Sequence, residues 1–213
     1  LNYKLLDKYL LTATLRADGS SVLAKGNQWG YFPSVAVAWR MKDESFLANV
    51  DEVSDLKLRL SYGLSGNSAV SPYQTGGLSK TMYEFGDVPA YGYRPYSMAN
   101  LKLKWEKTRV LNFGIDFGLL NNRVYATIDA YKTWTSDLLL PMILPGHTGF
   151  TSVISNVGKT ETRGIDLSIN TVNFDTKDFK WTTDLTFSAN KEKITALNTD
   201  QDDVGSGWFI GSP

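Results

Sequence analysis

Seven charged residues occupy polar positions in segments where apolar and polar residues alternate. They are Arg40, Lys57, Arg59, Asp116, Asp129, Asp166 and Asp184. The three cations precede the four carboxylates, so an antiparallel sheet would place a basic sector beside an acidic one. Such groups form charge-assisted hydrogen bonds where water is partly excluded. The alternative is a mixed set of charges on a wet surface, bridged by water.

A second candidate site is a tyrosine-rich stretch within residues 66–105. Tyr91, Tyr93 and Tyr96 are the best candidates for ligand contact, because exposed aromatic faces stack on sugar rings and tyrosine hydroxyls hydrogen-bond. The alternative is that these rings pack the loop itself or stand at a membrane interface. The latter role is expected of the aromatics near strand ends, namely Trp39, Tyr62, Trp105, Trp134 and Trp181.

Catalytic and metal chemistry find little support in the sequence. The motifs of serine hydrolases, P-loops and zinc proteases do not occur. His147 is the only histidine and there is no cysteine, so we expect no zinc site and no other cofactor. The segment from Asn198 to Asp203 begins like a calcium loop, but its sixth position is Asp203 where a calcium loop needs glycine. We expect a solvated loop there, with weak external calcium binding left open.

The composition excludes several classes of protein. The 213 residues include 22 basic and 22 acidic side chains, and this balance does not favour nucleic-acid binding. No apolar run approaches the roughly 18 residues that a membrane helix needs. No signal peptide is visible after Leu1. We interpret both ends of the chain as cuts within a longer protein, so that residues 1–213 are a fragment.

Seven segments have a two-residue period, which is typical of strands. In residues 55–65, five apolar side chains fall on one face, and lysine, arginine, serine and glycine fall on the other. The segments are 9–16, 34–40, 55–65, 111–119, 124–131, 164–170 and 181–190. Most have about 9–11 residues, the length with which a tilted strand crosses a bilayer.

The connections between these segments alternate in length. Short ones include the tight turn 120–123, in which asparagine supplies positive φ angles, while the longest is 66–105. Turns on one side and long loops on the other predict an all-β, antiparallel up-and-down meander in a transmembrane barrel. The alternative is a soluble β-sandwich, such as a glycan-binding module, which would bury one face of each sheet.

Six stretches resemble, in order and spacing, the C-terminal half of SusC/RagA-type TonB-dependent transporters. They are 15–21 (LRADGSS), 29–40 (WGYFPSVAVAWR), 53–67 (VSDLKLRLSYGLSGN), 103–108 (LKWEKT), 112–116 (NFGID) with 120–123 (LNNR), and 156–158 (NVG) with 162–166 (TRGID). The resemblance implies a 22-stranded barrel with an N-terminal plug in the outer membrane of a Gram-negative, Bacteroidetes-like bacterium.

The resemblance also implies a function and partners. The function is active import of large nutrients, with an oligosaccharide or peptide as ligand and no enzymatic activity. The implied partners are a SusD-like surface lipoprotein, the lipid bilayer, and TonB, which would act through a region outside these residues. The seven charges would then face the plug. A passive porin or adhesin barrel is the alternative within membranes.

Overall fold

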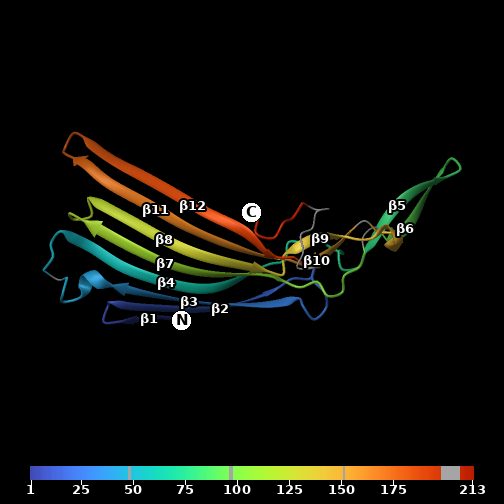
Figure 1. Cartoon of the computed structure of the whole chain (residues 1–213), viewed down its shortest axis with the longest axis horizontal. Helices are drawn as coiled ribbons and strands as arrows, with labels where there is room; N and C mark the ends of the chain where they lie inside the picture. Colours follow the sequence, from blue (N-terminus) through green and yellow to red (C-terminus); the bar gives the residue numbers. More distant parts are fainter. Residues whose placement is uncertain (48, 96–97, 151, 198–206) are drawn as a thin grey trace.

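The main body of the protein is one antiparallel sheet of eight strands. The computed structural model describes residues 1–47, 49–95, 98–150, 152–197 and 207–213, with the backbone alone for 78–85, 90–91 and 93–95. The strand order is β1-β2-β3-β4-β7-β8-β11-β12, so sheet neighbours follow the chain (Figure 1). The bounds are Asn2–Leu5 (β1), Tyr9–Gly19 (β2), Trp29–Arg40 (β3), Val53–Asn67 (β4), Glu106–Leu119 (β7), Val124–Ser136 (β8), Lys159–Asp175 (β11) and Lys180–Ala196 (β12).

The described part of the chain contains no helix that is both long and apolar enough to cross a membrane.

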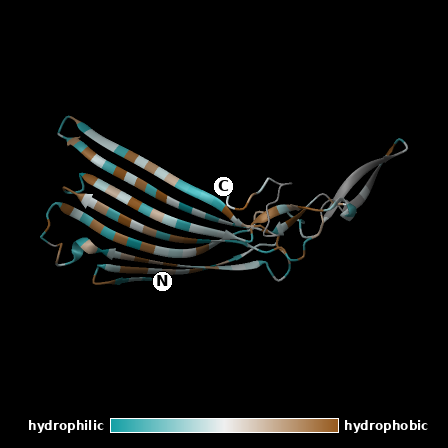
Figure 2. Cartoon of the chain, in the orientation of Figure 1, coloured by the Kyte–Doolittle hydropathy of each residue, from teal (hydrophilic) through white to brown (hydrophobic). Residues whose placement is uncertain are grey.

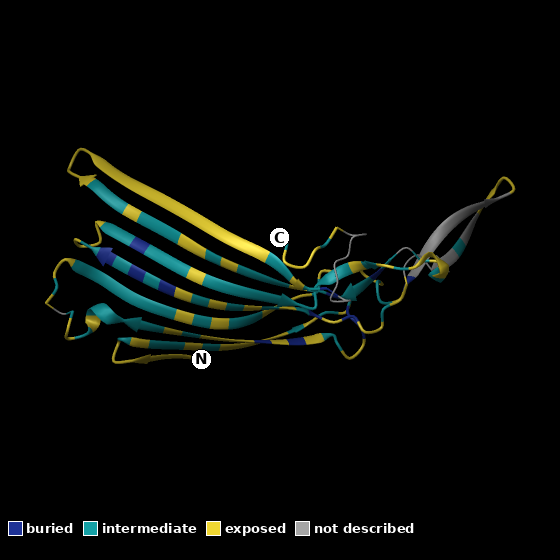
Figure 3. Cartoon of the chain, viewed as in Figure 1, coloured by how far each residue is buried: buried dark blue, intermediate teal, exposed yellow. Residues whose placement is uncertain are grey.

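The sheet is a single curved layer with two different faces. Brown residues alternate with teal or white ones along the strands in Figure 2, most clearly in the half of the sheet nearest the short turns, because successive side chains point to opposite faces. We call the face that bears Leu60, Phe113 and Phe187 the apolar face, and these side chains are 46%, 45% and 57% exposed. The opposite, polar face bears Lys57 and Asp116. No second layer covers the apolar face within the described residues, and Figure 3 shows few buried positions along the strands. The meander is therefore confirmed, and the sandwich is wrong.

The two ends of the sheet differ, as the connection lengths predict. Short turns lie at one end, which we call the turn end, and the long connections gather at the other, the loop end (Figure 1). At the turn end, Asn121 and Asn122 have φ angles of 56° and 60°, which confirms their expected role. A short 3-10 helix, η1 (Met41–Asp43), begins the connection between β3 and β4.

The strands differ from the prediction in number and length. The chain begins with β1, a four-residue strand paired with β2, which is too short for periodicity to reveal. The other seven have 11 to 17 residues. A tilted strand needs about 9–11 residues to cross a bilayer. The surplus lies largely at the loop end, where β4, β7, β8, β11 and β12 extend beyond the predicted segments.

Two small hairpins lie in the loops, apart from the main sheet. β5 (Leu78–Phe85) pairs with β6 (Val88–Pro95), and β9 (Leu139–Ile143) pairs with β10 (Ser152–Asn156). A second 3-10 helix, η2 (Gly146–Thr148), connects β9 to β10. The β5–β6 hairpin projects away from the main sheet (Figure 1). The loops therefore contain regular structure that the two-residue periodicity did not predict.

A small hydrophobic cluster anchors the loops to the loop end of the sheet. It comprises Leu23, Ala24, Phe32, Leu103 and Trp105. Phe32 and Trp105 pack edge to face with ring centroids 5.4 Å apart, and the Trp105 indole donates to the Gln28 carbonyl at 3.2 Å. Trp105 is therefore a core residue, and its prediction as an interfacial aromatic is wrong.

Candidate functional site

A charged cluster on the polar face is built by the register of three strands. Lys57 and Arg59 lie two residues apart on β4 and therefore share a face. Lys57 pairs with Asp116 on β7, while Arg59 pairs with Gly114, which in turn pairs with Asp129 on β8. The register alone thus brings two cations and two carboxylates of the predicted set together.

Gly114 permits the contact that crosses β7. A Cβ atom at this position would lie 2.6 Å from Cζ of Arg59 and 2.6 Å from Oδ1 of Asp129. Real Cβ atoms essentially never approach so closely, so a side chain here would displace the guanidinium. The absence of a side chain lets Arg59 reach over the strand. Sequence reasoning missed Gly114, although its position between two charged strands is a signal that could have indicated it.

Asp116 is the centre of the cluster and is only 4% exposed. It accepts two hydrogen bonds from Arg59, from Nε at 2.9 Å and from Nη2 at 2.8 Å. Lys57 Nζ lies 2.8 Å from its Oδ2 atom, and Arg59 Nη2 also donates to Asp129 at 3.0 Å. Two positive and two negative charges cancel, so the cluster is a self-neutralised network that joins β4, β7 and β8.

The other three predicted charges lie outside this cluster. Arg40 pairs with Asp43 at 3.2 Å, in the connection at the turn end. Asp166 accepts from the Ser188 hydroxyl, and Asp184 accepts from the Asn170 amide. The cations thus lie on β3 and β4, beside the carboxylates on β7, β8, β11 and β12, but only four of the seven residues form one contacting cluster.

Asp166 and Asp129 form an acidic pair beside the cluster. They are register partners on β11 and β8. Carboxylates directly opposite each other repel. Within the described residues, Oδ1 of Asp129 is buried without a hydrogen-bond partner. Asp166 therefore adds a negative charge on β11, directly beside the neutral cluster.

Glu44 is a second polar hub that sequence reasoning missed. It lies just after η1 and accepts hydrogen bonds from Lys8 at 2.9 Å, Tyr9 at 2.8 Å and Trp39 at 3.1 Å. The hydrogen bonds from Lys8, Tyr9 and Trp39 lower the pKa of Glu44 from 4.5 to about 2. Glu44 therefore ties the β3–β4 connection to the turn between β1 and β2.

The tyrosine candidates are only partly described. Tyr91 and Tyr93 lie on β6, where their register partners on β5 are Met82 and Lys80. Tyr96 lies outside the described residues, as do Asn198, Asp200, Asp202 and Asp203 of the possible calcium loop. The described backbone thus places two of the three tyrosines on the projecting hairpin.

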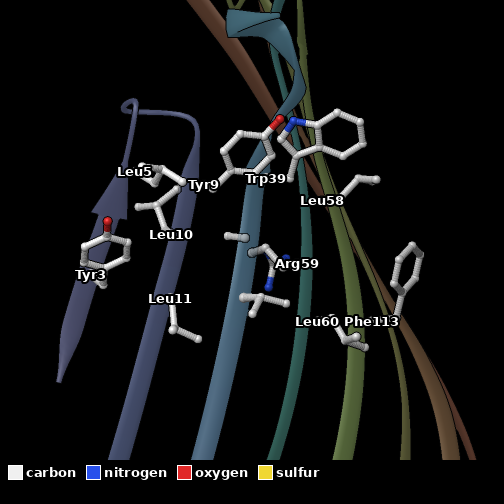
Figure 4. A pocket seen from close by; sticks show the side chains of 12 residues that line it. Tyr3, Leu5, Tyr9, Leu10, Leu11, Trp39, Leu58, Arg59, Leu60 and Phe113 are labelled. Atoms are coloured by element: carbon white, nitrogen blue, oxygen red, sulfur yellow. The ribbon is translucent and has the colours of Figure 1, made fainter.

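The apolar face contains an open groove of about 500 Å³ across β1 to β4. Tyr3, Tyr9, Trp39, Leu58 and Leu60 are among the residues that line it (Figure 4). Tyr9 stacks on Trp39 with ring centroids 6.2 Å apart at the turn end of the groove. A surface that is apolar along the strands and aromatic at their ends suits lipid tails and the membrane interface.

These features define the class of protein. The described residues combine long strands, an apolar face without a second layer, a charged opposite face, and turns opposite long loops. Together these form a wall segment of a transmembrane β-barrel. The family model "TonB dependent receptor-like, beta-barrel" matches residues 1–212, and the chain belongs to this family.

Named relatives agree with this family. The chain is 41% identical, over 95% of its length, to TonB-dependent receptor SusC of Bacteroides thetaiotaomicron. It is 40% identical, over 99% of its length, to TonB-dependent receptor P3 of Formosa agariphila. It spans 21% of each of these two curated relatives. The solved structure "Structure of the RagAB peptide transporter" superposes with a TM-score of 0.89 at 30% identity, covering the whole chain and 24% of that structure. The SusC/RagA resemblance is confirmed.

Proposed function

We propose that this chain supplies barrel wall and external loops to a TonB-dependent importer of large nutrients. The importer lies in the outer membrane of a Gram-negative, Bacteroidetes-like bacterium. The observation that carries this proposal is the two-faced single layer in a chain of the TonB-dependent receptor family. Lipid covers the apolar face, and the polar face lines a wet passage.

The orientation follows from the two ends of the sheet. In bacterial barrels the turns are periplasmic and the longer loops are extracellular. The turn end is therefore periplasmic, and the β5–β6 hairpin projects outward. Tyr91 and Tyr93, together with Tyr96, would contact an oligosaccharide or peptide at the entrance. The similar RagAB structure is a peptide transporter, which supports a peptide as ligand, while SusC, the other relative, leaves an oligosaccharide as the second candidate.

The partners follow from the same relatives. A SusD-like surface lipoprotein would cover the external loops, and TonB would couple energy through a plug outside these residues. The charged cluster is a structural brace of the wall, because its four members neutralise one another. The plug would meet Asp166 and Asp184, whose described partners are neutral side chains.

Deletion of TonB tests the importer against a passive porin. Uptake by cells that depend on the full-length protein is expected to stop without TonB, whereas a porin would keep passing small solutes. Retained uptake in the TonB-deleted strain would contradict the proposal.

Hydrogen exchange tests the plug contact. The double variant Asp166→Asn, Asp184→Asn should reduce the protection of plug amides, and unchanged protection would show that these residues do not contact the plug.

The triple variant Tyr91→Ala, Tyr93→Ala and Tyr96→Ala tests the ligand site. Stacking on an aromatic ring contributes about 1 kcal/mol or more for each ring, so the loss of three rings should weaken ligand binding by at least tenfold. Assembly should be unchanged. Tyr3→Ala, on the apolar face, is the matched control and should leave binding as it was. Equal affinity of the triple variant and the control would refute the site.

A further inference from the structure

The apolar face changes character at the loop end, where seven cations occupy its positions. Each lies an even number of residues from an apolar-face residue of the same strand, such as Phe113, Ala130, Ile165 or Ala189, so each shares that face. The seven are Lys107, Arg109, Lys132, Lys159, Arg163, Lys191 and Lys193, which we call the basic rim. They are about a third of the 22 basic residues of a chain with no net charge.

The rim cations are side by side because of the strand register. Arg163 on β11 pairs with Lys132 on β8 and with Lys191 on β12, directly beyond the row that contains Ile165. Like charges directly opposite each other destabilise a sheet. An anion bound over such a row would reduce the repulsion between the cations and so stabilise the sheet.

Among the described residues, Glu161 is the one carboxylate paired with the rim. It lies 3.0 Å from Lys132, 2.7 Å from Arg163 and 3.9 Å from Lys193. Seven cations against one carboxylate leave an excess of six positive charges. Four rim cations, Lys107, Arg109, Lys159 and Lys191, have no ion pair within the described residues. The rim therefore has too few negative charges on the described part of its own sheet to neutralise it.

The height of the rim matches the boundary of the hydrocarbon. On β7 the apolar face runs from Leu119 to Leu111, and Arg109 follows. Eight steps of about 3.4 Å on a strand tilted by about 40° rise about 21 Å, close to the roughly 25 Å apolar band of outer-membrane barrels. At the opposite boundary the same face bears aromatics, including Tyr9 and Trp39. The cations thus lie at the level of headgroups in the outer leaflet alone.

A hollow in the rim has the chemistry to hold a headgroup. Its volume is about 590 Å³, and its lining includes Tyr62, Arg109, Trp134 and Lys159. Asp137 also lines it, and its carboxylate is neutralised by Lys104 at 3.0 Å. Lys132 Nζ lies 4.8 Å from the centroid of the Trp134 ring, which orients a cation over an aromatic surface. Sugar rings stack on aromatic faces, and Arg and Lys donate hydrogen bonds to phosphate oxygens.

We propose that the basic rim binds a phosphorylated glycolipid of the outer leaflet, with its phosphates on Arg109, Lys159 and Arg163 and its sugar on Trp134. Transported cargo passes along the polar face, so it does not reach this site. The proposal rests on the outer-membrane location in the proposed function. It does not depend on import, because the role of the bound lipid would be to anchor the barrel in its membrane and not to take part in transport.

The test uses the full-length protein, purified in detergent and analysed by native mass spectrometry with added lipid. Lipid A carrying its phosphates is compared with dephosphorylated lipid A and with inorganic phosphate as competitor. Phosphorylated lipid A is expected to bind at least tenfold more tightly than the dephosphorylated form. Equal binding of the two forms would overturn the proposal. Complete displacement by millimolar inorganic phosphate would also overturn it, because a simple phosphate site would then suffice.

A charge-neutralised variant adds a second arm. Each cation near an anionic surface contributes about fivefold in affinity, so Arg109→Gln, Lys159→Gln and Arg163→Gln together should weaken lipid A binding about 100-fold. The control is Lys102→Gln, Lys177→Gln and Lys180→Gln, which removes the same charge elsewhere. Heat-modifiable migration checks that each variant forms a barrel. Wild-type lipid affinity in a folded rim variant would refute the proposal, whereas TonB-dependent uptake reports on the proposed function separately.

Discussion

Asp116 offers the sharpest test of the charged cluster, because it joins two cations on one strand. Asp116→Asn keeps the shape of the side chain but removes its charge and one acceptor oxygen. The carboxylate accepts two hydrogen bonds from Arg59 and forms an ion pair with Lys57. The amide can retain one of these three contacts. Arg59 would keep Asp129, and Lys57 would lose its partner.

The magnitude follows from the burial of the three groups. Hydrogen bonds to charged groups contribute about 1.5–3 kcal/mol each when buried. The Lys57 and Arg59 side chains are 31% and 32% exposed, so water partly compensates for the loss. We therefore expect Asp116→Asn to lower the free energy of unfolding by about 2–3 kcal/mol.

Urea unfolding of the full-length barrel in detergent micelles, followed by tryptophan fluorescence, measures this difference at constant slope. Asp175→Asn is the matched control, because its ion pair with Lys180 at 3.4 Å joins side chains that are 55% and 63% exposed. Its cost should stay below about 1 kcal/mol. Equal costs for the two variants would refute the reasoning, since burial between two cations would then have no measurable value.

Three further predictions test the faces and the turn end. Leu60→Arg on the apolar face should destabilise the barrel by about 2–4 kcal/mol, while Ser61→Arg on the polar face should be near neutral, both read by urea unfolding. The pKa of Glu44 falls from 4.5 to about 2 on folding, so its stabilisation is complete above pH 4.5 and is lost as the pH falls towards 2. Glu44→Gln should therefore make the unfolding midpoint less dependent on pH below 4.5. An unchanged pH dependence would show that the Glu44 carboxylate does not stabilise the fold. A Cβ at Gly164 would lie 2.3 Å from Cζ of Tyr131. Gly164→Ala should therefore lower the free energy of unfolding by about 1–2 kcal/mol in the wild-type background. The loss should be smaller when Tyr131→Ala is also present, and a double-mutant cycle measures the difference.

The faces of the sheet could be predicted from the sequence because they depend only on alternation. Leu56, Leu58 and Leu60 fall on one face and Lys57 and Arg59 on the other in any strand, whatever its neighbours. The turn 120–123 was equally local, since asparagine tolerates the positive φ angles found there. Local preferences and the global fold therefore agree over most of the main sheet.

The features that were missed depend on contacts between distant segments. Pro141 argues against a strand, yet β9 contains it, because β9 pairs with β10 alone and a proline is tolerated where no ladder bond is needed. Trp105 has the residue type and the position near a strand end that are typical of an interfacial aromatic, but it packs on Phe32, 73 positions away along the chain. No periodicity within one segment reports such a partner.

The charged cluster depends both on alternation along single strands and on contacts between distant segments, so it shows how far each of them can be predicted. Alternation places Arg59, Asp116 and Asp129 on one face, but only register decides which of them touch. Register puts Gly114 between Arg59 and Asp129, and the missing Cβ turns two separated charges into a pair 3.0 Å apart. The same logic places Arg163 between Lys132 and Lys191 on the other face, where like charges meet instead. This sheet neutralises the charged cluster on its polar face. At one edge of its apolar face it leaves four cations without an ion pair among the described residues, which on physical grounds calls for an anionic partner at that edge.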